Sequence, residues 1–464
     1  MERRLIFTKE VKSSNHFSLE PCQLDYPLDI PDIRKESLDI PEVSEIEVVR
    51  HYTKLSKLAH GVDDGFYPLG SCTMKYNPKI SEELAALAGF AQIHPLQPSD
   101  TVTGCLKIIE ELKESLCKVT GMADFSLAPA AGAHGEFAGL LMVRKYHESR
   151  QDTKRTIVLV PDSAHGTNPA SANMCGYQVV TVPSDKKGTV DLAALKDLLS
   201  DQVACLMLTN PNTLGLFESE IAEIAKSVHQ AGGLLYYDGA NLNAIMGIAR
   251  PKEMGFDIVH LNLHKTFGTP HGGGGPGSGP VGCVEELSEF LPNNDSENSV
   301  GKIKAFHGNF LVLVKALCYI KLLGLEGLAE VSKHATLNAN YLMHQLHEDF
   351  DIPFYDQGCM HEFVISLQNH KEEREITALD IAKALIDHDI HPPTVYFPLI
   401  VKEALMVEPT ETENRETMDD FVRIMKDILK DENIKSRPLT TPITRVDEVK
   451  AAREPILRYR KKDT

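Results

Sequence analysis

Between residues 125 and 263, short apolar stretches alternate with helix-like stretches of the chain. We expect strands at residues 125–128, 157–160, 179–182, 204–208, 234–237 and 258–263. The intervening segments carry apolar residues at helical spacing, as in residues 191–199 and 219–230. Because such alternation is typical of βα units, it predicts an α/β fold with a mostly parallel sheet flanked by helices.

Polar side chains stand at the ends of four of these predicted strands. They are Asp162, Asn210, Asp238 and Lys265. The carboxyl ends of parallel strands meet at one edge of a sheet, and ligands bind there. The polar loops at residues 162–169 and 209–213 are expected to contact such a ligand, although turn formation alone would also explain their composition.

The chain of 464 residues is too long for a single core, which predicts more than one domain. We expect residues 1–98 to form an N-terminal arm, Pro-rich up to residue 42, and a helical segment that includes a helix at 44–58. Residues 99–330 would form the large ligand-binding domain. A long helical region at 308–350 would lead into a smaller C-terminal α/β domain, residues 331–464.

Charge and composition exclude several classes of partner. The net charge of -18 argues against binding to nucleic acid or to an anionic membrane, since either needs a basic surface. We expect neither a secretory signal after Met1 nor a membrane span. The nine cysteines contain no CxxC pair, which predicts reduced thiols and a cytoplasmic location.

Lys265 lies two residues after the last predicted strand, and six glycines follow it among residues 272–279. A displayed lysine beside a loop with few side chains is suited to form a Schiff base with a flat partner. A solvated surface lysine followed by a linker is the alternative. Asp238 at the end of a neighbouring strand favours the first interpretation, because a carboxylate can pair with the pyridine nitrogen of pyridoxal phosphate (PLP).

A phosphate site is expected at Gly132 and Ala133, which lie between a predicted strand and a predicted helix. Free backbone N–H groups at a helix start bind phosphate, although an ordinary turn would look the same. His134 would then stack on the cofactor ring. Its alternative role is that of a capping or solvated histidine.

The remaining candidate site residues lie near these positions. His264 could reach the phosphate or the substrate, and Ala240 and Asn210 are expected to contact the cofactor. His260 is predicted to be a buried, hydrogen-bonded core residue. We expect no metal site, because His260 and His264 would lie about 13 Å apart along a strand.

Several motifs together resemble the P-protein family of the glycine cleavage system, glycine dehydrogenase (decarboxylating). The resemblance covers nearly the whole chain. Its motifs are Tyr67-Pro-Leu-Gly-Ser-Cys-Thr-Met-Lys75, Ala131-Gly-Ala-His-Gly-Glu136, Asp162-Ser-Ala-His-Gly-Thr-Asn-Pro169, Tyr237-Asp-Gly-Ala-Asn241, Asn262-Leu-His-Lys-Thr-Phe267, His271-Gly-Gly-Gly-Gly-Pro-Gly277, Pro392-Pro-Thr-Val-Tyr-Phe-Pro-Leu-Ile400 and Glu408-Pro-Thr-Glu-Thr-Glu413.

This resemblance implies a fold type I PLP enzyme and the subunit that carries the cofactor lysine in the split form of the family. By matching position, Lys265 would form the internal aldimine, Asp238 would pair with the pyridine nitrogen, His134 would stack on the ring, and Ala133 with its neighbours would hold phosphate. Glycine would be decarboxylated through a PLP external aldimine. Its aminomethyl group would pass to the lipoyl disulfide of the H-protein.

The resemblance also implies a partner, subunit 1 of the P-protein, with two copies of each subunit in the assembly. We further expect the glycines of residues 272–279 and the small residues Ser71 to Thr73 to line a channel for the lipoyl arm. The alternative is another fold type I PLP enzyme, an amino-acid decarboxylase or an aminotransferase, which would not depend on the H-protein.

Overall fold

The computed structural model describes residues 5–8, 34–36, 40–41, 43–272 and 275–458. The chain forms two compact units, one of residues 65–437 and one of residues 1–64 together with 438–464. The domain boundaries predicted at residues 98 and 330 stay predictions. Most of the predicted arm at residues 1–42, and Gly273 and Gly274 of the glycine loop, lie outside the described residues.

The unit of residues 1–64 and 438–464 contains helix α1 (Glu45–Ser56), where a helix was predicted. Ser44 caps its first turn, because the Ser44 hydroxyl accepts the Glu47 N–H and the Glu47 carboxylate accepts the Ser44 N–H. The unit also contains the 3-10 helix η1 (Ile6–Thr8) and helix α14 (Glu448–Arg453). In the part of the chain that the structure describes, no helix combines the length and apolar character needed to cross a bilayer.

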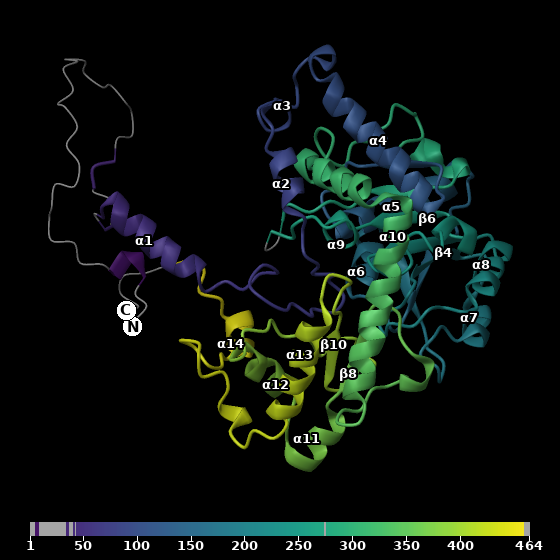
Figure 1. The fold of residues 1–464 in the computed structure, drawn as a ribbon. Coiled ribbons are helices and arrows are strands. Elements are labelled where there is room, and N and C mark those ends of the chain that lie inside the picture. Colours follow the sequence, from purple (N-terminus) through teal and green to yellow (C-terminus); the bar gives the residue numbers. More distant parts are fainter. Residues whose placement is uncertain (1–4, 9–33, 37–39, 42, 273–274, 459–464) are drawn as a thin grey trace, which may run out of the picture. The chain divides into compact units, whose positions relative to one another are not determined.

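A seven-stranded sheet organises the unit of residues 65–437, in the order β1-β7-β6-β5-β4-β2-β3 (Figure 1). Its strands are β1 (Asp124–Ser126), β2 (Ile157–Pro161), β3 (Gln178–Val182), β4 (Val203–Thr209), β5 (Leu234–Gly239), β6 (Ile258–Leu261) and β7 (Val281–Cys283). Strands β2 to β6 pair in parallel, whereas β7 is antiparallel to both of its neighbours. The predicted mostly parallel sheet is therefore confirmed. The three-residue strand β7 follows a Gly- and Pro-rich loop, and its short length left no periodicity to recognise.

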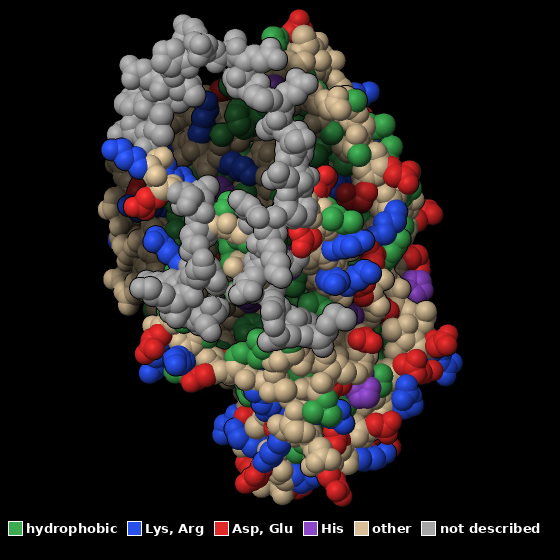
Figure 2. All heavy atoms as spheres, turned by 90° about the vertical axis from the view of Figure 1, so that its left-hand side faces the viewer, with side chains coloured by type: hydrophobic (Ala, Val, Ile, Leu, Met, Phe, Trp, Pro, Cys, Tyr) green, Lys and Arg blue, Asp and Glu red, His purple; other side chains and the backbone are tan. Residues whose placement is uncertain are grey.

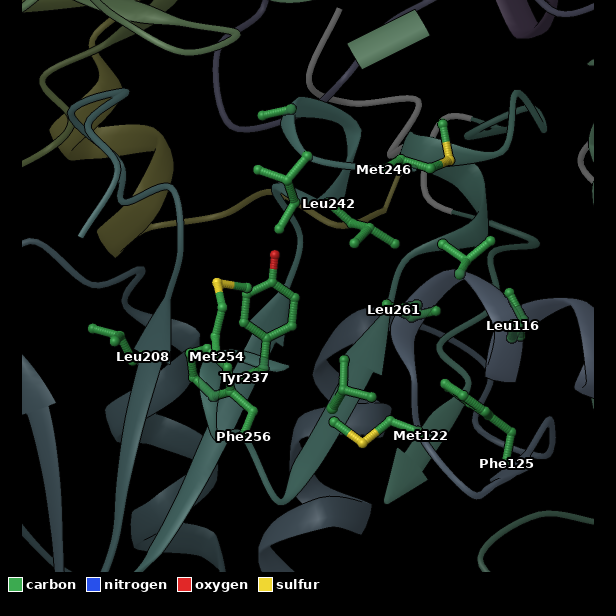
Figure 3. Close-up of a cluster of buried hydrophobic side chains, with 14 of the residues drawn as sticks. Leu116, Met122, Phe125, Leu208, Tyr237, Leu242, Met246, Met254, Phe256 and Leu261 are labelled. Carbon is green, nitrogen blue, oxygen red and sulfur yellow. The ribbon is translucent and has the colours of Figure 1, made fainter. Parts of the chain in front are cut away.

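Helices cover both faces of this sheet and form two apolar cores. The helices are α4 (Thr103–Thr120), α5 (Gly132–Ser149), α6 (Thr167–Met174), α7 (Leu192–Leu198), α8 (Ile221–Gln230) and α10 (Phe310–Leu346). Tyr237 packs into the core with α4, α8 and α10, part of which is drawn in Figure 3. Its neighbour Tyr236 points to the opposite face, into the core with α5 and α6. Adjacent residues of one strand thus bury both faces, as a sheet covered on both sides requires.

A smaller antiparallel sheet follows α10, which runs from the large sheet toward it (Figure 1). Its order is β8 (Phe363–Ser366), β10 (Ala404–Val407), β9 (Thr394–Val395), and α11 (Gln368–Arg374), α12 (Ala378–Ile386) and α13 (Arg415–Ile428) belong to the same region. The predicted strand at residues 362–367 is confirmed as β8.

The loop before α2 (Lys79–Ala85) is attached to this small sheet. Gly70 donates its N–H to the Met406 carbonyl at 3.1 Å, and its own carbonyl accepts the Thr394 hydroxyl at 2.7 Å. A Cβ at Gly70 would stand 2.7 Å from the Met406 carbonyl oxygen, so the close approach requires glycine here. This attachment determines where the next residue, Ser71, lies.

Candidate active site

A cavity of about 280 Å³ lies where the carboxyl ends of β4, β5 and β6 meet the start of α5. This is the position that a parallel sheet predicts for a ligand. Its lining residues are Ser71, Cys72, Ala131, Gly132, Ala133, Glu136, His165, Thr167, Thr209, Thr213, Asp238, Ala240, Asn241, His260, Asn262, His264 and Lys265. Three larger depressions elsewhere in this unit do not include Lys265 or Asp238.

Lys265 reaches the cavity from the single-turn helix α9 (Leu263–Thr266). We expected the preceding strand to continue to residue 263, but β6 ends at Leu261, and Asn262 is the cap residue of the turn. The side chain is 8% exposed, and its Nζ donates to the Ser71 carbonyl at 2.7 Å. A largely desolvated amine is therefore held at the wall of the cavity.

Asp238, in β5, lies 2% exposed at the same cavity. Its Oδ2 accepts the Asn168 amide at 2.9 Å, and its Oδ1 accepts the Ala240 N–H at 3.0 Å and lies 3.2 Å from His260 Nε2. Burial raises the pKa of this carboxyl, but His260 and the donated hydrogen bonds outweigh burial and lower it. Asp238 is thus a buried carboxylate that keeps its negative charge.

The histidine next to Asp238 belongs to the buried network, as predicted. His260 is 1% exposed, and its Nδ1 lies 2.9 Å from the Tyr236 hydroxyl. The contacts from Tyr236 to His260 and from His260 to Asp238 fix the orientation of the Asp238 carboxylate.

The start of the 18-residue helix α5 provides the free backbone N–H groups expected of a phosphate site. A Cβ at Gly132 would lie 2.6 Å from the Asn262 side-chain oxygen, so the close approach of the two segments depends on glycine. The Asn262 Oδ1 and the Thr209 hydroxyl are buried and have no hydrogen-bond partner within the described chain. These unpaired polar atoms and the helix start fit an anionic, hydrogen-bonding ligand such as PLP.

Two other predicted residues also line the cavity. His264 accepts the Ser278 N–H at 3.3 Å, and burial, with nearby His271, lowers its pKa to about 3, so its imidazole is neutral. Ala240 follows Asp238 by two residues and presents no bulky side chain to the cavity. A neutral His264 can exchange hydrogen bonds with a ligand without adding charge.

The structure does not bring His134 and Asn210 to the cavity lining. The Nδ1 of His134 accepts the Ala130 N–H at 3.2 Å, which holds the ring against the preceding turn. Asn210 accepts the Glu218 N–H at 3.0 Å and donates to the Met254 sulfur, so it connects two loops. Both side chains are already engaged in local structure, which spacing along the sequence did not reveal.

His165 lines the cavity instead, on the loop between β2 and α6. Burial, with nearby Lys265, lowers the pKa of His165, and both residues line the same cavity. The loops predicted to contact a ligand, at 162–169 and 209–213, do contribute His165, Thr167, Thr209 and Thr213 to the lining. In the sequence, His165 could have been recognised from its position in the polar loop that follows strand β2.

Comparison with known proteins identifies the family. A curated protein of Treponema denticola named "Probable glycine dehydrogenase (decarboxylating) subunit 2" is 56% identical over 474 aligned positions, which cover 98% of each chain. The chain belongs to the glycine dehydrogenase (decarboxylating) subunit 2 family. Another member, from Caldanaerobacter subterraneus subsp. tengcongensis, is 54% identical over 98% of this chain and 99% of its own.

One family model agrees with this membership, and two solved structures agree with the fold. Residues 331–442 match the family model "Glycine dehydrogenase, C-terminal domain", and residues 134–274 match "Aminotransferase class-V". A crystal structure of glycine decarboxylase (P-protein) of the glycine cleavage system, in inhibitor-bound form, superposes with a TM-score of 0.70 at 20% identity, covering 88% of this chain and 92% of that one. A NifS-like protein from Rickettsia africae superposes with a TM-score of 0.62 at 14% identity, covering 79% of this chain and 100% of that one.

The predictions of family, fold type I class, enzyme class and PLP as cofactor are therefore confirmed. The alternative of another fold type I enzyme is not favoured. The roles of individual residues stay predictions, and the residues that line the cavity are the candidates for those roles.

Proposed function

We propose that the 280 Å³ cavity is the active site in which this chain decarboxylates glycine, with Lys265 as the residue that binds PLP covalently. The observation that carries the proposal is the convergence of three features on one cavity. They are the desolvated amine of Lys265, the charged Asp238 and the start of α5. Each matches one part of PLP: its aldehyde, its pyridine nitrogen and its phosphate.

When bound, PLP supplies an electron sink for the electron pair that remains after CO2 leaves glycine. The carboxylate of Asp238 would keep a proton on the pyridine nitrogen, because its negative charge is buried and fixed by His260 and Asn168. The N–H groups of Gly132 and Ala133 would hold the phosphate. Ser71 holds the Lys265 amine at the cavity wall through its carbonyl.

We assign the stacking role to His165 and no longer to His134. His165 lines the cavity, whereas His134 does not and is bound to the Ala130 N–H. The other two histidines of the lining are engaged elsewhere, His260 by Asp238 and Tyr236, and His264 by the Ser278 N–H. An imidazole has a flat face that packs against an aromatic ring. His264 and Ala240 stay in the proposed site, and Asn210 supports it from the β4 loop.

The finer functional proposal concerns the acceptor and the partners. The aminomethyl group passes to the lipoyl disulfide of the H-protein. Subunit 1 of the P-protein is the partner, and the assembly contains two copies of each chain. The reaction takes place in the cytoplasm. The family name and the likeness to a P-protein support this proposal. Figure 2 shows acidic and basic side chains interspersed on one face, which fits a protein partner better than nucleic acid.

The glycine loop has a packing role as well as a proposed channel role. A Cβ at Gly279 would lie 2.0 Å from the Ala131 carbonyl oxygen, and one at Gly277 would lie 3.0 Å from His264. These two glycines allow the loop to approach the phosphate site closely. Clearance for a lipoyl arm stays a proposal, supported by Ser71 and Cys72 at the cavity wall.

Borohydride reduction of the PLP-loaded enzyme, followed by peptide mass spectrometry, tests the assignment. We expect a pyridoxyl label on Lys265 and its loss in Lys265→Ala, whereas Lys154→Ala, at an exposed lysine, keeps the label. A label on any other lysine would overturn the proposal. Exchange of labelled CO2 with the glycine carboxyl should depend on lipoylated H-protein, and equal exchange with unlipoylated H-protein would refute that acceptor.

A further inference from the structure

Glu362, just before β8, contacts two residues of the cavity lining but is not itself part of that lining. It is 0% exposed. One carboxylate oxygen accepts the Ser71 N–H at 2.8 Å, and the other accepts the Asn241 amide at 3.1 Å. Both Ser71 and Asn241 line the cavity. A single buried carboxylate therefore binds the loop before α2 to the end of β5.

Ser71 transmits this contact directly to the proposed cofactor lysine. Its N–H donates to Glu362, and its carbonyl accepts Lys265 Nζ at 2.7 Å. Its φ angle of 67° lies in the left-handed region, which non-glycine residues rarely adopt. Such strain persists only where surrounding contacts impose it, and it gathers at functional sites. Here the two hydrogen bonds of Ser71 impose it.

The backbone on both sides of this connection is closely packed. A Cβ at Gly215 would lie 1.8 Å from the Glu362 carbonyl oxygen, and the Met360 N–H donates to the Gly215 carbonyl at 2.7 Å. On the other side, Gly70 is bound to Met406 of β10. Because neither end can shift easily, the position of the Glu362 carboxylate determines the position of Ser71.

Glu362 belongs to a buried group of three titratable side chains. The His361 Nε2 lies 3.7 Å from a Glu362 oxygen and 4.0 Å from a Glu408 oxygen, and neither ring nitrogen has a hydrogen-bond partner within the described residues. Burial raises the pKa of both glutamates and, with nearby lysines, lowers the pKa of His361 to about 3. The charged groups that influence this group are Lys265, Lys75 and Glu411.

The two glutamates of this group differ in their neighbours. Glu362 accepts hydrogen bonds from two N–H donors, which favour its charged form, whereas the neighbour of Glu408 is the Thr73 hydroxyl. Because the two carboxyls are buried close together, they titrate as a pair, and the two N–H donors fix the orientation of the Glu362 carboxyl.

We propose that Glu362 is a positioning residue that holds the Lys265 amine in place through the backbone of Ser71. The inference rests on the proposed function, because it presupposes that Lys265 binds PLP. Replacing one carboxyl oxygen of Glu362 removes one of its two donor contacts. The Lys265 amine, which the Ser71 carbonyl accepts, is then less well fixed.

The test compares Glu362→Gln with Glu413→Gln in the PLP-loaded enzyme. A glutamine can accept only one of the two N–H donors, because its amide nitrogen faces the other. We expect kcat for glycine decarboxylation to fall about 10- to 100-fold, the size of a charged hydrogen bond, with a smaller change in KM. The pH midpoint of the visible absorption band should shift by about one unit, because the Lys265 amine is held differently.

Glu413 is the control, since it lies on the segment after β10 that also carries Glu408, and burial raises its pKa to about 7. Glu413→Gln should leave kcat and the absorption midpoint unchanged. Equal behaviour of the two variants would overturn the inference. A stoichiometric metal ion in the purified enzyme, bound by the three atoms that lie within 4.8 Å of one another, would also overturn it.

A second variant keeps the test decisive if Glu362→Gln does not fold. Glu362→Asp retains the carboxyl group but shortens the side chain, so we expect a fall in kcat with a smaller shift of the absorption midpoint than in Glu362→Gln. An unchanged kcat in that variant would contradict the positioning role. Borohydride labelling distinguishes the two failures: a label away from Lys265 refutes the proposed function, whereas a label on Lys265 without these kinetic changes refutes only the role of Glu362.

Discussion

Lys75 Nζ lies 2.6 Å from a carboxylate oxygen of Glu411, and the two side chains are 1% and 8% exposed. The same ammonium donates to Asn243 Oδ1 at 2.6 Å and to the Thr266 carbonyl at 3.1 Å. Burial opposes the charge, but Glu411 outweighs it, and the pKa of Lys75 is raised. This ion pair thus connects the loop before α2, the turn that carries Lys265 and the segment after β10.

Removing one partner of this ion pair should destabilise the fold. Because Lys75→Met leaves Glu411 buried without its counter-charge, we expect the free energy of unfolding to fall by about 3–5 kcal/mol. Urea denaturation measures the change. Lys196→Met is the control, since the Lys196–Glu223 pair is 47% and 37% exposed and should contribute about 0.2–1 kcal/mol. Equal losses in the two variants would contradict a special role for Lys75.

Neutralising Asp238 should slow catalysis more than it weakens folding. Asp238→Asn retains the shape of the side chain but removes the charge that pairs with the pyridine nitrogen. We expect kcat to fall about 10²- to 10³-fold, as for the loss of one preorganised electrostatic contact. Asp162→Asn is the control, because Asp162 also follows a strand but binds the Ser184 N–H, at 3.0 Å, outside the cavity lining. A comparable fall in that control would argue against the assignment.

We predict different effects on cofactor binding when His165 and His134 are substituted. His165→Ala should weaken PLP binding about tenfold and shift the absorption maximum, because it removes a flat surface at the cavity. His134→Ala should leave both properties unchanged. Titration of the apoenzyme with PLP, followed by absorbance, measures them. The reverse result would restore the stacking role to His134.

Glu218 should make stability depend on pH. Burial raises its pKa from 4.5 to about 7, although it accepts the Val190 N–H. The folded state therefore binds more protons than the unfolded state, so its contribution to stability is lost as pH rises from about 4.5 to about 7. This loss amounts to roughly 3 kcal/mol.

The variant Glu218→Gln removes this dependence. We expect its free energy of unfolding to decline less than that of the wild type between about pH 5 and 7.5, as measured by urea denaturation at several pH values. The exposed Glu220→Gln serves as the control and should follow the wild type. Parallel pH profiles for all three proteins would show that Glu218 does not titrate in this range.

The sequence pattern was most informative where a strand is marked by its own apolar residues and by the polar residues beside it. The strand that carries Asp238 and the strand that precedes Lys265 were recognised from runs of apolar residues and from the polar residues that follow them. It was less successful at short or irregular segments. β6 was predicted two residues too long, because Asn262 and Leu263 continue the apolar alternation while the backbone already turns into α9.

The sequence by itself determined the α/β class and the candidate chemistry of Lys265 and Asp238, because hydrophobic period and strand ends depend on neighbouring residues. Only the tertiary structure decided which side chains share the cavity. His165 lines it and His134 does not, and Glu362 meets Ser71 across 291 residues of sequence. Such contacts depend on how separate elements pack, and no local pattern encodes that distance. Lys265 can therefore be identified from the sequence, whereas Ser71 and Glu362, which hold it in place, can be identified only from the tertiary structure.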